Sequence, residues 1–258
     1  QWEAKFRAAL DELQNMAILD VLIPTFGDRI CDIKGLDRHP DIRYVIAHQN
    51  YNDIVLPAFT TREDVIYHQV DSKGVAKNRN FLLDQCESGH FYFRDDDVQM
   101  VEDWTNVLLD AIATNPYDVL IFRVSLPDGR DFKYGYGKVS NIVRGKLGLK
   151  DLGMIEVVCP AFIRDISCFD EDFGIGTVNA ISEDYIFWCD LWDLGLNFIR
   201  LNKVICTHGY IHSGTHFNVG IVRGKFFVFW RVFGVAGVLV FILYLIKTEI
   251  KHYKDISL

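Results

Sequence analysis

Three adjacent aspartates, Asp95, Asp96 and Asp97, follow a short apolar run at residues 91–93. Neighbouring carboxylates oppose one another's ionisation, and a divalent cation removes that cost because hard cations bind carboxylate oxygens. In open α/β sheets, ligands bind at the carboxyl ends of the strands. The triplet therefore predicts a metal site that could hold a diphosphate. A solvated turn is the alternative, because aspartate is common in turns.

A second acidic group, Glu183 and Asp184, directly precedes an apolar-faced segment that predicts a helix over 183–194. Ser182 fits the N-cap position, and carboxylates in the first turn of a helix interact favourably with the positive end of the helix dipole. The pair could therefore be a structural helix start. The functional alternative is that one carboxylate acts as a general base toward an attacking hydroxyl.

Histidines cluster near the end of the last predicted strand, at His208, His212 and His216. Their four-residue spacing is also that of paired zinc ligands on a helix, but Gly209 and Gly214 favour a loop. One of these imidazoles could approach a bound metal, and a neutral imidazole hydrogen-bonded within a loop is the alternative.

The elements that must position these groups alternate along the chain. Apolar runs predict strands over 18–23, 42–47, 65–70, 91–93, 119–124, 156–163 and 198–204, and helical spacing predicts helices over 2–16, 76–86, 103–113 and 183–194. Pro24 is expected to end the first strand, and the segment 127–150, rich in Gly and Lys, is expected to form loops. This alternation predicts a mostly parallel α/β sheet flanked by helices.

The composition supports a folded core and argues against binding to nucleic acid. Half of the 258 residues are hydrophobic, and the formal net charge is −8. A nucleic-acid-binding protein would need a basic face. The six cysteines lack CxxC spacing, which favours buried free thiols and a reducing compartment.

The C-terminal segment 226–258 differs from the rest of the chain. Residues 232–246 form an uncharged apolar run, and Lys and Arg residues lie on both sides of it. A full membrane span needs about 20 apolar residues, so the run is short for one. Its apolar character on all sides disfavours an amphipathic helix lying on the membrane surface. We expect a hydrophobic membrane-proximal helix here, with a core helix or a dimer contact as the alternatives.

The order of these motifs resembles that of the family 2 glycosyltransferases, which have the GT-A fold. The matching stretches are the opening strand and nucleotide loop at 18–25, a Gly-x-x-x-x-Arg-Asn stretch within 73–80, a DxD motif within 93–97, and a Phe-Asp-Glu, glycine and ED series at 169–176, 183–184 and 195. The resemblance covers roughly residues 18–231. The resemblance implies a GT-A-like (Rossmann-like) α/β fold.

The resemblance also implies a role for each candidate residue. Asp184 would be the catalytic base of an inverting, single-displacement transfer, and Glu183 would position the acceptor or the base. Mg²⁺ or Mn²⁺ would bind through Asp95, Asp97 and His208. Contacts to the nucleotide or its diphosphate would come from Thr25, Lys73, Arg79, Asp95 and Asp96.

Two departures from the family pattern limit what the resemblance implies. Residues 48–53 replace the acidic pair that many relatives carry after the second strand, which leaves the nucleobase open. Trp230 and Arg231 stand in the opposite order to the Gln-x-x-Arg-Trp motif of the processive synthases, which favours single addition over polymerisation.

The sequence thus predicts an N-terminal helix (1–17), a GT-A-like domain (18–225) and a membrane-associating segment (226–258). The expected activity is transfer of a sugar from a nucleotide-diphosphate sugar to a glycan or lipid-linked acceptor. The expected place is the cytoplasmic face of a bacterial inner membrane, in surface glycan synthesis. A sugar-nucleotide nucleotidyltransferase and a non-catalytic carbohydrate-binding or scaffold protein on the same fold are the alternatives.

Overall fold

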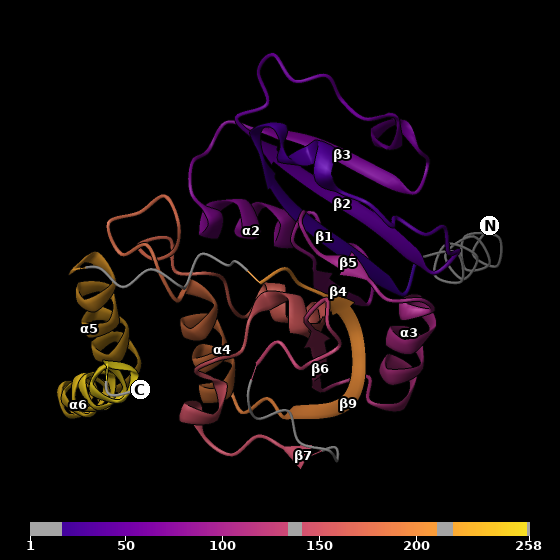
Figure 1. Ribbon diagram of the computed structural model, residues 1–258. Coiled ribbons are helices and arrows are strands. Elements are labelled where there is room, and N and C mark those ends of the chain that lie inside the picture. The colour runs from indigo at the N-terminus through magenta and orange to yellow at the C-terminus, as the bar shows by residue number, and fades with distance from the viewer. Residues whose placement is uncertain (1–16, 134–140, 211–218, 257–258) are drawn as a thin grey trace.

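The computed structural model describes residues 17–133, 141–210 and 219–256. The predicted N-terminal helix over 2–16 lies outside the described residues, as do His212 and His216. Figure 1 shows a central sheet with helices on both faces and a pair of helices, α5 and α6, at one side of it.

One sheet runs through the body of the molecule in the order β3-β2-β1-β4-β8-β6-β9-β5, with β7 beside β9. Its strands are β1 (Leu19–Phe26), β2 (Ile42–Gln49), β3 (Val65–Val70), β4 (His90–Phe93), β5 (Gln99–Met100), β6 (Val119–Ser125), β7 (Asn141–Ile142), β8 (Val157–Pro160) and β9 (Phe198–Thr207). The helices are α2 (Val75–Asp84), α3 (Trp104–Thr114), α4 (Glu183–Asp193), α5 (Val219–Phe233) and α6 (Ala236–Ile256).

The direction of the strands differs between the two halves of the sheet. In the half formed by β3, β2, β1 and β4 all neighbours are parallel. In the other half, β8 is antiparallel to β4 and β6, and β9 is parallel to β6 but antiparallel to β5 and β7. The predicted α/β sheet flanked by helices is confirmed, and its parallel half is the one that carries the acidic triplet.

Alternation of side chains along the central strands builds one apolar core on each face of the sheet. In β4, Phe91 and Phe93 point to the face covered by α2 and α4, whereas Tyr92 points to the face covered by α3. Because successive strand residues face opposite sides, a continuous apolar run such as 91–93 is typical of a strand buried on both faces. The two cores fix β4 and therefore fix the loop that follows it.

Pro24 does not end the first strand, because β1 continues to Phe26. The pairing of β1 with β4 stops at Leu22 and Phe93, whereas its pairing with β2 continues to Phe26. Beyond Leu22 one side of β1 has no paired strand, and a proline without an N–H is tolerated there. Within 127–150, predicted as loops, the described residues include the short strand β7 and a turn of 3₁₀ helix at Lys146–Leu149.

The C-terminal segment forms two helices, where the sequence predicts one. α5 begins at Val219, so the predicted boundary at 225/226 lies within it, and the chain turns at Gly234, whose φ is +58°. The inner sides of both helices pack on the protein, because Val228 and Val232 of α5 join the core under α4, and Phe241 and Tyr244 of α6 pack against it. None of the helices in the described part of the chain combines the length and apolar character needed to cross a membrane.

Candidate active site

The acidic triplet lies beside the carboxyl end of β1. Leu22 of β1 pairs with Phe93 of β4, so the register places Thr25 level with Asp96. The Thr25 hydroxyl donates a hydrogen bond of 2.8 Å to Oδ2 of Asp96. Asp96 is only 3% exposed, and this burial raises the pKa of its carboxyl to about 6, although the Thr25 and Arg29 contacts oppose the rise. Asp96 is therefore a structural member of the triplet, whereas Asp97 faces solvent.

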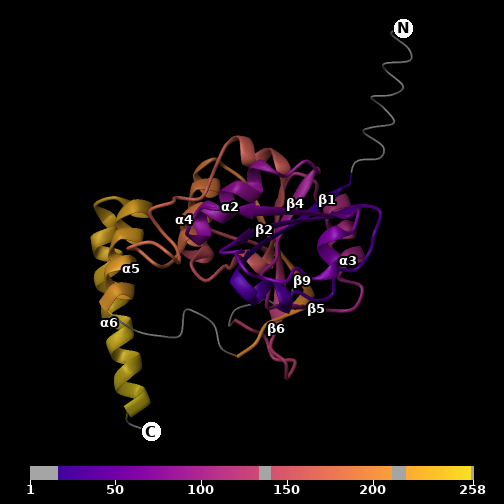
Figure 2. The same cartoon turned by 90° about the horizontal axis from the view of Figure 1, so that it is seen from above.

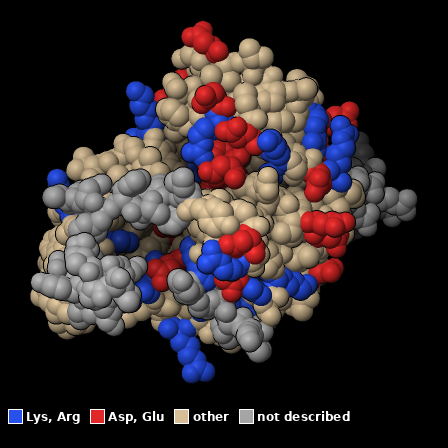
Figure 3. All heavy atoms as spheres, in the orientation of Figure 1, with Lys and Arg blue, Asp and Glu red and all other residues tan. Residues whose placement is uncertain are grey.

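Arg29, which belongs to none of the sequence motifs described above, joins this group. It lies in a 3₁₀ helix at Gly27–Asp32 that directly follows β1, and its guanidinium donates to Asp96 Oδ1 and, over 3.1 Å, to Asp97 Oδ2. A cation in the loop after the first strand shares a sheet edge with the triplet, and that position was the available signal. Figure 3 shows acidic and basic side chains close together on the face of the molecule that is seen in Figure 1.

Arg79 connects the triplet to the ED pair at the start of α4. From α2, its guanidinium donates to Oε1 of Glu183 over 2.8 Å and lies 3.9 Å from Oδ1 of Asp95. Arg79 is buried, and its guanidinium also stacks on the Phe169 ring with 5.6 Å to the ring centroid. Burial raises the pKa of the Glu183 carboxyl, and the Arg79 charge opposes this rise. Arg79 thus holds a buried carboxylate in place at one end of the candidate site.

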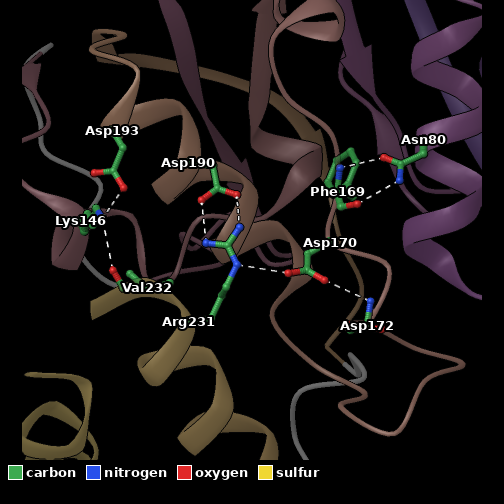
Figure 4. A network of polar contacts seen from close by, with 9 residues as sticks. All are labelled: Asn80, Lys146, Phe169, Asp170, Asp172, Asp190, Asp193, Arg231 and Val232. Carbon is green, nitrogen blue, oxygen red and sulfur yellow. Dashed lines mark hydrogen bonds and ion pairs between the residues drawn. The ribbon is translucent and has the colours of Figure 1, made fainter. Parts of the chain in front are cut away.

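The glycine-rich loop at 169–176 is fastened to α2. Asn80 donates from its amide to the Phe169 carbonyl over 2.9 Å and accepts from the Phe169 N–H over 2.7 Å, as Figure 4 shows. The loop then crosses Gly74, where a Cβ on Gly176 would lie 2.8 Å from the Gly74 Cα. A Cβ on Gly174 would lie 3.0 Å from the Glu183 carboxyl group. Both glycines have positive φ, near +97°, so backbone conformation and close approach both require glycine.

At the start of α4, Ser182 adopts a left-handed conformation with φ of +64°. It occupies the N-cap position as predicted, but its side chain makes no capping hydrogen bond. Its hydroxyl instead accepts a 2.8 Å hydrogen bond from Nζ of Lys225 in α5. Asp184 is partly exposed, and its Oδ1 accepts from the Tyr185 N–H over 2.8 Å. Of the two ED carboxylates, Glu183 is therefore held in a buried ion pair and Asp184 is the accessible one.

His208 directly follows β9 and approaches the triplet from the other half of the sheet. Its Nε2 lies 3.9 Å from Oδ1 of Asp97, and its ring packs on Phe132 with 4.8 Å between centroids. Its Nδ1 is 2.9 Å from the Gly209 carbonyl oxygen, which can only accept, so Nδ1 carries a proton. In the neutral ring Nε2 is then an acceptor that faces a carboxylate.

His208 Nε2 and Asp97 Oδ1 are spaced to bind one divalent cation, if the other ligands of that cation come from a bound substrate. An ion bonded at about 2.1 Å to an imidazole nitrogen or a carboxylate oxygen can span the 3.9 Å between His208 Nε2 and Asp97 Oδ1. Within the described ranges, no cluster of three or more His, Cys, Asp and Glu side chains is arranged to hold a metal ion. Mg²⁺ sites commonly combine one or two carboxylates with substrate phosphates, and such a site needs no complete cage of protein ligands.

Two branches of contacts join most of the predicted site residues. The first runs through Thr25, Asp96, Arg29, Asp97 and His208, and the second joins Asp95, Arg79 and Glu183; the backbone between Asp95 and Asp96 links the two. Asp184 adjoins the end of the second branch. Lys73 is exposed, directly before Gly74.

Comparison with known proteins gives a family and a fold. A sequence model described as Glycosyl transferase family 2 matches residues 39–168, half of the chain, which include Lys73, Arg79 and the triplet but neither Thr25 nor the ED pair. No curated protein sequence matches the chain.

Among solved structures, S. aureus TarS 1–349 aligns with a TM-score of 0.64 at 15% identity, over 83% of this chain and 64% of that one. The same fragment in complex with UDP-GlcNAc aligns with a TM-score of 0.65 at 14% identity, over 83% of this chain and 66% of that one. S. aureus TarS in a longer form aligns with a TM-score of 0.61 at 14% identity, over 82% of this chain and 39% of that one. The chain therefore spans less than two thirds of each of these structures, and at such identity the likeness concerns the fold.

Proposed function

Because this chain belongs to glycosyl transferase family 2 and has the GT-A fold, we propose that it moves a sugar from a nucleotide-diphosphate sugar onto an acceptor hydroxyl, with inversion. The observation that carries this proposal is the series of contacts from the acidic triplet through Arg79 to Glu183, beside Asp184. Under this proposal, the residues that would hold a charged leaving group lie next to an accessible carboxylate, which supports the assignment. A TarS structure in complex with UDP-GlcNAc supports a nucleotide sugar as the donor.

The triplet side of the site would hold the donor's diphosphate. Asp97, Asp95 and His208 are the residues that would hold Mg²⁺ or Mn²⁺, and such an ion, when bound, stabilises the charge of a leaving diphosphate. Arg29 is half exposed and already lies on Asp96 and Asp97, so it is placed to contact a phosphate oxygen as well. Thr25 holds Asp96, and Lys73 supplies a second exposed cation.

The ED side of the site would activate the acceptor. Glu183 is ion-paired with Arg79, so Asp184 is the group that would accept the proton from the acceptor hydroxyl. The acceptor oxygen forms a bond to the anomeric carbon while the bond from that carbon to the diphosphate oxygen breaks. Attack from the face opposite the leaving group inverts the anomeric carbon. The acceptor would be a glycan or lipid-linked hydroxyl in surface glycan synthesis, at the cytoplasmic face of a bacterial inner membrane.

A thermal-shift screen of nucleotide sugars, with and without Mn²⁺, tests the donor assignment. A ligand that binds only the folded state at 100 times its Kd stabilises the protein by about 2.7 kcal/mol. One nucleotide sugar should raise the Tm more than its competitors do, and Mn²⁺ should be needed for the full shift. Asp97→Asn should reduce the Mn²⁺-dependent part and leave the Tm of the free protein nearly unchanged. Equal shifts with Mn²⁺ and with EDTA would count against the metal, and no shift with any nucleotide sugar would count against the function.

A further inference from the structure

The paired helices α5 and α6 carry large apolar side chains that face away from the protein. Phe227 and Trp230 lie on α5, and Leu239, Ile242, Leu243 and Ile246 lie on α6; these six residues are called the hairpin face below. Each is between 38% and 62% exposed. Large exposed apolar side chains gathered on one pair of packed helices indicate a site of interaction with a partner or a membrane.

The opposite sides of both helices are already occupied. Phe226 and Phe229 of α5 pack edge-to-face on Phe241 and Tyr244 of α6, with ring centroids 5.3 and 5.8 Å apart. A Cβ on Gly237 would lie 2.1 Å from the Phe229 carbonyl oxygen, so the two backbones are in close contact. The apolar residues on the different sides of α6 therefore have two kinds of environment. One side packs within the protein, and the other is the hairpin face.

Ion pairs fix the orientation of the hairpin on the body. Arg231 of α5 donates to Asp190 of α4 over 2.9 and 3.2 Å, and to Asp170 over 3.3 Å, as Figure 4 shows. Lys146 donates to the Val232 carbonyl over 3.3 Å. Figure 2 shows the two helices standing side by side at one edge of the molecule. The hairpin face is thus held on the outside of a fixed element.

The segment that carries the hairpin face has a net charge of the opposite sign to that of the rest of the chain. Residues 219–258 contain six Lys and Arg against two Asp and Glu, a net charge of +4, whereas the other residues contain 21 against 33, a net charge of −12. Arg223 and Lys247 are exposed beside the face, and Arg223 lies over the Phe227 ring at 5.6 Å from its centroid. Apolar side chains bordered by cations complement an anionic lipid surface. A second copy would bring two basic hairpins together and is disfavoured.

The hairpin also contacts the start of the candidate catalytic helix. Lys225 lies on the inner side of α5 and donates a hydrogen bond to the Ser182 hydroxyl, whereas Phe227 and Trp230 lie on the outer side of α5. The diameter of a helix with its side chains is about 10 Å. The residue that precedes the ED pair is therefore about one helix diameter from the hairpin face.

We propose that the hairpin face binds an anionic lipid bilayer, with its apolar side chains in the interface and Arg223 and Lys247 among the head groups. The consequence of this binding rests on the proposed function. When the hairpin face is bound to the bilayer, the start of α4, which bears Asp184, is held next to a lipid-linked acceptor. The binding itself requires no donor, so it can be tested apart from the transfer reaction.

The test is co-sedimentation of the 258-residue protein with vesicles of phosphatidylglycerol and phosphatidylcholine, compared with vesicles of phosphatidylcholine alone. The wild type should bind the anionic vesicles more tightly, and binding should weaken with salt. Leu239→Gln/Leu243→Gln should lower the partition coefficient about 25-fold, since burying the exposed part of each leucine contributes about fivefold. Arg223→Gln/Lys247→Gln should lower it by a similar factor, about fivefold per cation.

Val55→Gln/Tyr117→Gln is the matched control, because these residues are 88% and 79% exposed in the β2–β3 and α3–β6 connections of the protein body. It should bind vesicles as the wild type does. Equal binding to both kinds of vesicle, or wild-type binding by either hairpin variant, would overturn the proposal. A wild-type dimer that Leu239→Gln/Leu243→Gln converts to a monomer, without vesicle binding, would show instead that the face joins two copies. Vesicle binding without any nucleotide-sugar thermal shift would contradict the proposed function and leave the docking surface standing.

Discussion

The buried ion pair between Arg79 and Glu183 gives a prediction whose size follows from the structure. Arg79 is 7% exposed and Glu183 is 8% exposed, so Arg79→Met would leave a carboxylate inside the protein without its partner. Removing one partner of a buried ion pair typically costs about 3–5 kcal/mol. Asp184 is a neighbouring negative charge, which further disfavours an unpaired Glu183 carboxylate. We expect Arg79→Met to lower the free energy of unfolding at pH 7.5 by about 3 kcal/mol.

The same variant should show a characteristic dependence on pH. Burial raises the pKa of Glu183, and the Arg79 charge opposes the rise, so removal of Arg79 raises this pKa further. A carboxyl whose pKa is higher in the folded state holds its proton more tightly there than in the unfolded state. Its contribution to stability is therefore lost as the pH rises above the unfolded value, about 4.3 for glutamate. The deficit of Arg79→Met should be smaller at pH 5 than at pH 7.5.

Urea denaturation at pH 5 and 7.5 of the wild type, both single variants and the double variant measures these terms. Glu183→Gln removes the charge that Arg79→Met leaves unpaired, so Arg79→Met/Glu183→Gln should be more stable than Arg79→Met at pH 7.5. A cost below about 1 kcal/mol for Arg79→Met, a value typical of exposed pairs, would refute the reasoning. A deficit that is the same at both pH values would refute the assignment to Glu183.

Three further variants test other contacts. Burial opposes ionisation of Asp20, but hydrogen bonds from Arg43 lower the pKa of its carboxyl. Asp20→Asn should therefore lower the free energy of unfolding by about 3 kcal/mol at pH 7, measured by urea denaturation. The loss should be smaller at pH 3.5, because this contribution to stability disappears as the pH falls below about 3.9. Gly176→Ala places a Cβ 2.8 Å from Gly74 and should lower the Tm by about 4–8 °C in a thermal scan. Arg29→Gln removes a cation that competes for the triplet and should tighten Mn²⁺ binding about two- to fivefold without nucleotide, measured by the electron paramagnetic resonance of free Mn²⁺; unchanged affinity would argue against competition.

The sequence predicts the sheet well where apolar runs are long. The run at 65–70 predicts β3 with its observed bounds, and the continuous run at 91–93 predicts β4 to within one residue. The strands β5 and β7 have two residues each, too few for any periodicity to show. The turn at Gly234 lies within an uninterrupted apolar run, so no polar residue marks it in the sequence. Tertiary packing on both sides of the turn separates α5 from α6.

The site is predicted in its residue types but not in its contacts. Asp95 to Asp97 and Glu183 follow recognisable patterns, whereas the hydrogen bond between Arg79 and Glu183 joins residues 104 positions apart. No local signal reports such a distance, so the sequence could not show that the two motifs form one network. For Arg29, the position after the first strand indicates the correct edge of the sheet, but its contacts with Asp96 and Asp97, more than 60 positions away, have no local signal.

The assignment of Asp184 as the base is the central claim, and sugar transfer by Asp184→Asn tests it most directly. Asparagine keeps the size of the side chain and can still accept from the Tyr185 N–H, but it cannot take the acceptor's proton. General-base assistance contributes about 10²- to 10⁴-fold, so kcat should fall by that factor while nucleotide affinity, measured on the same preparation, stays nearly constant. Glu183→Gln should reduce kcat less or mainly raise the acceptor KM. Transfer by Asp184→Asn at a rate close to that of the wild type would contradict the account.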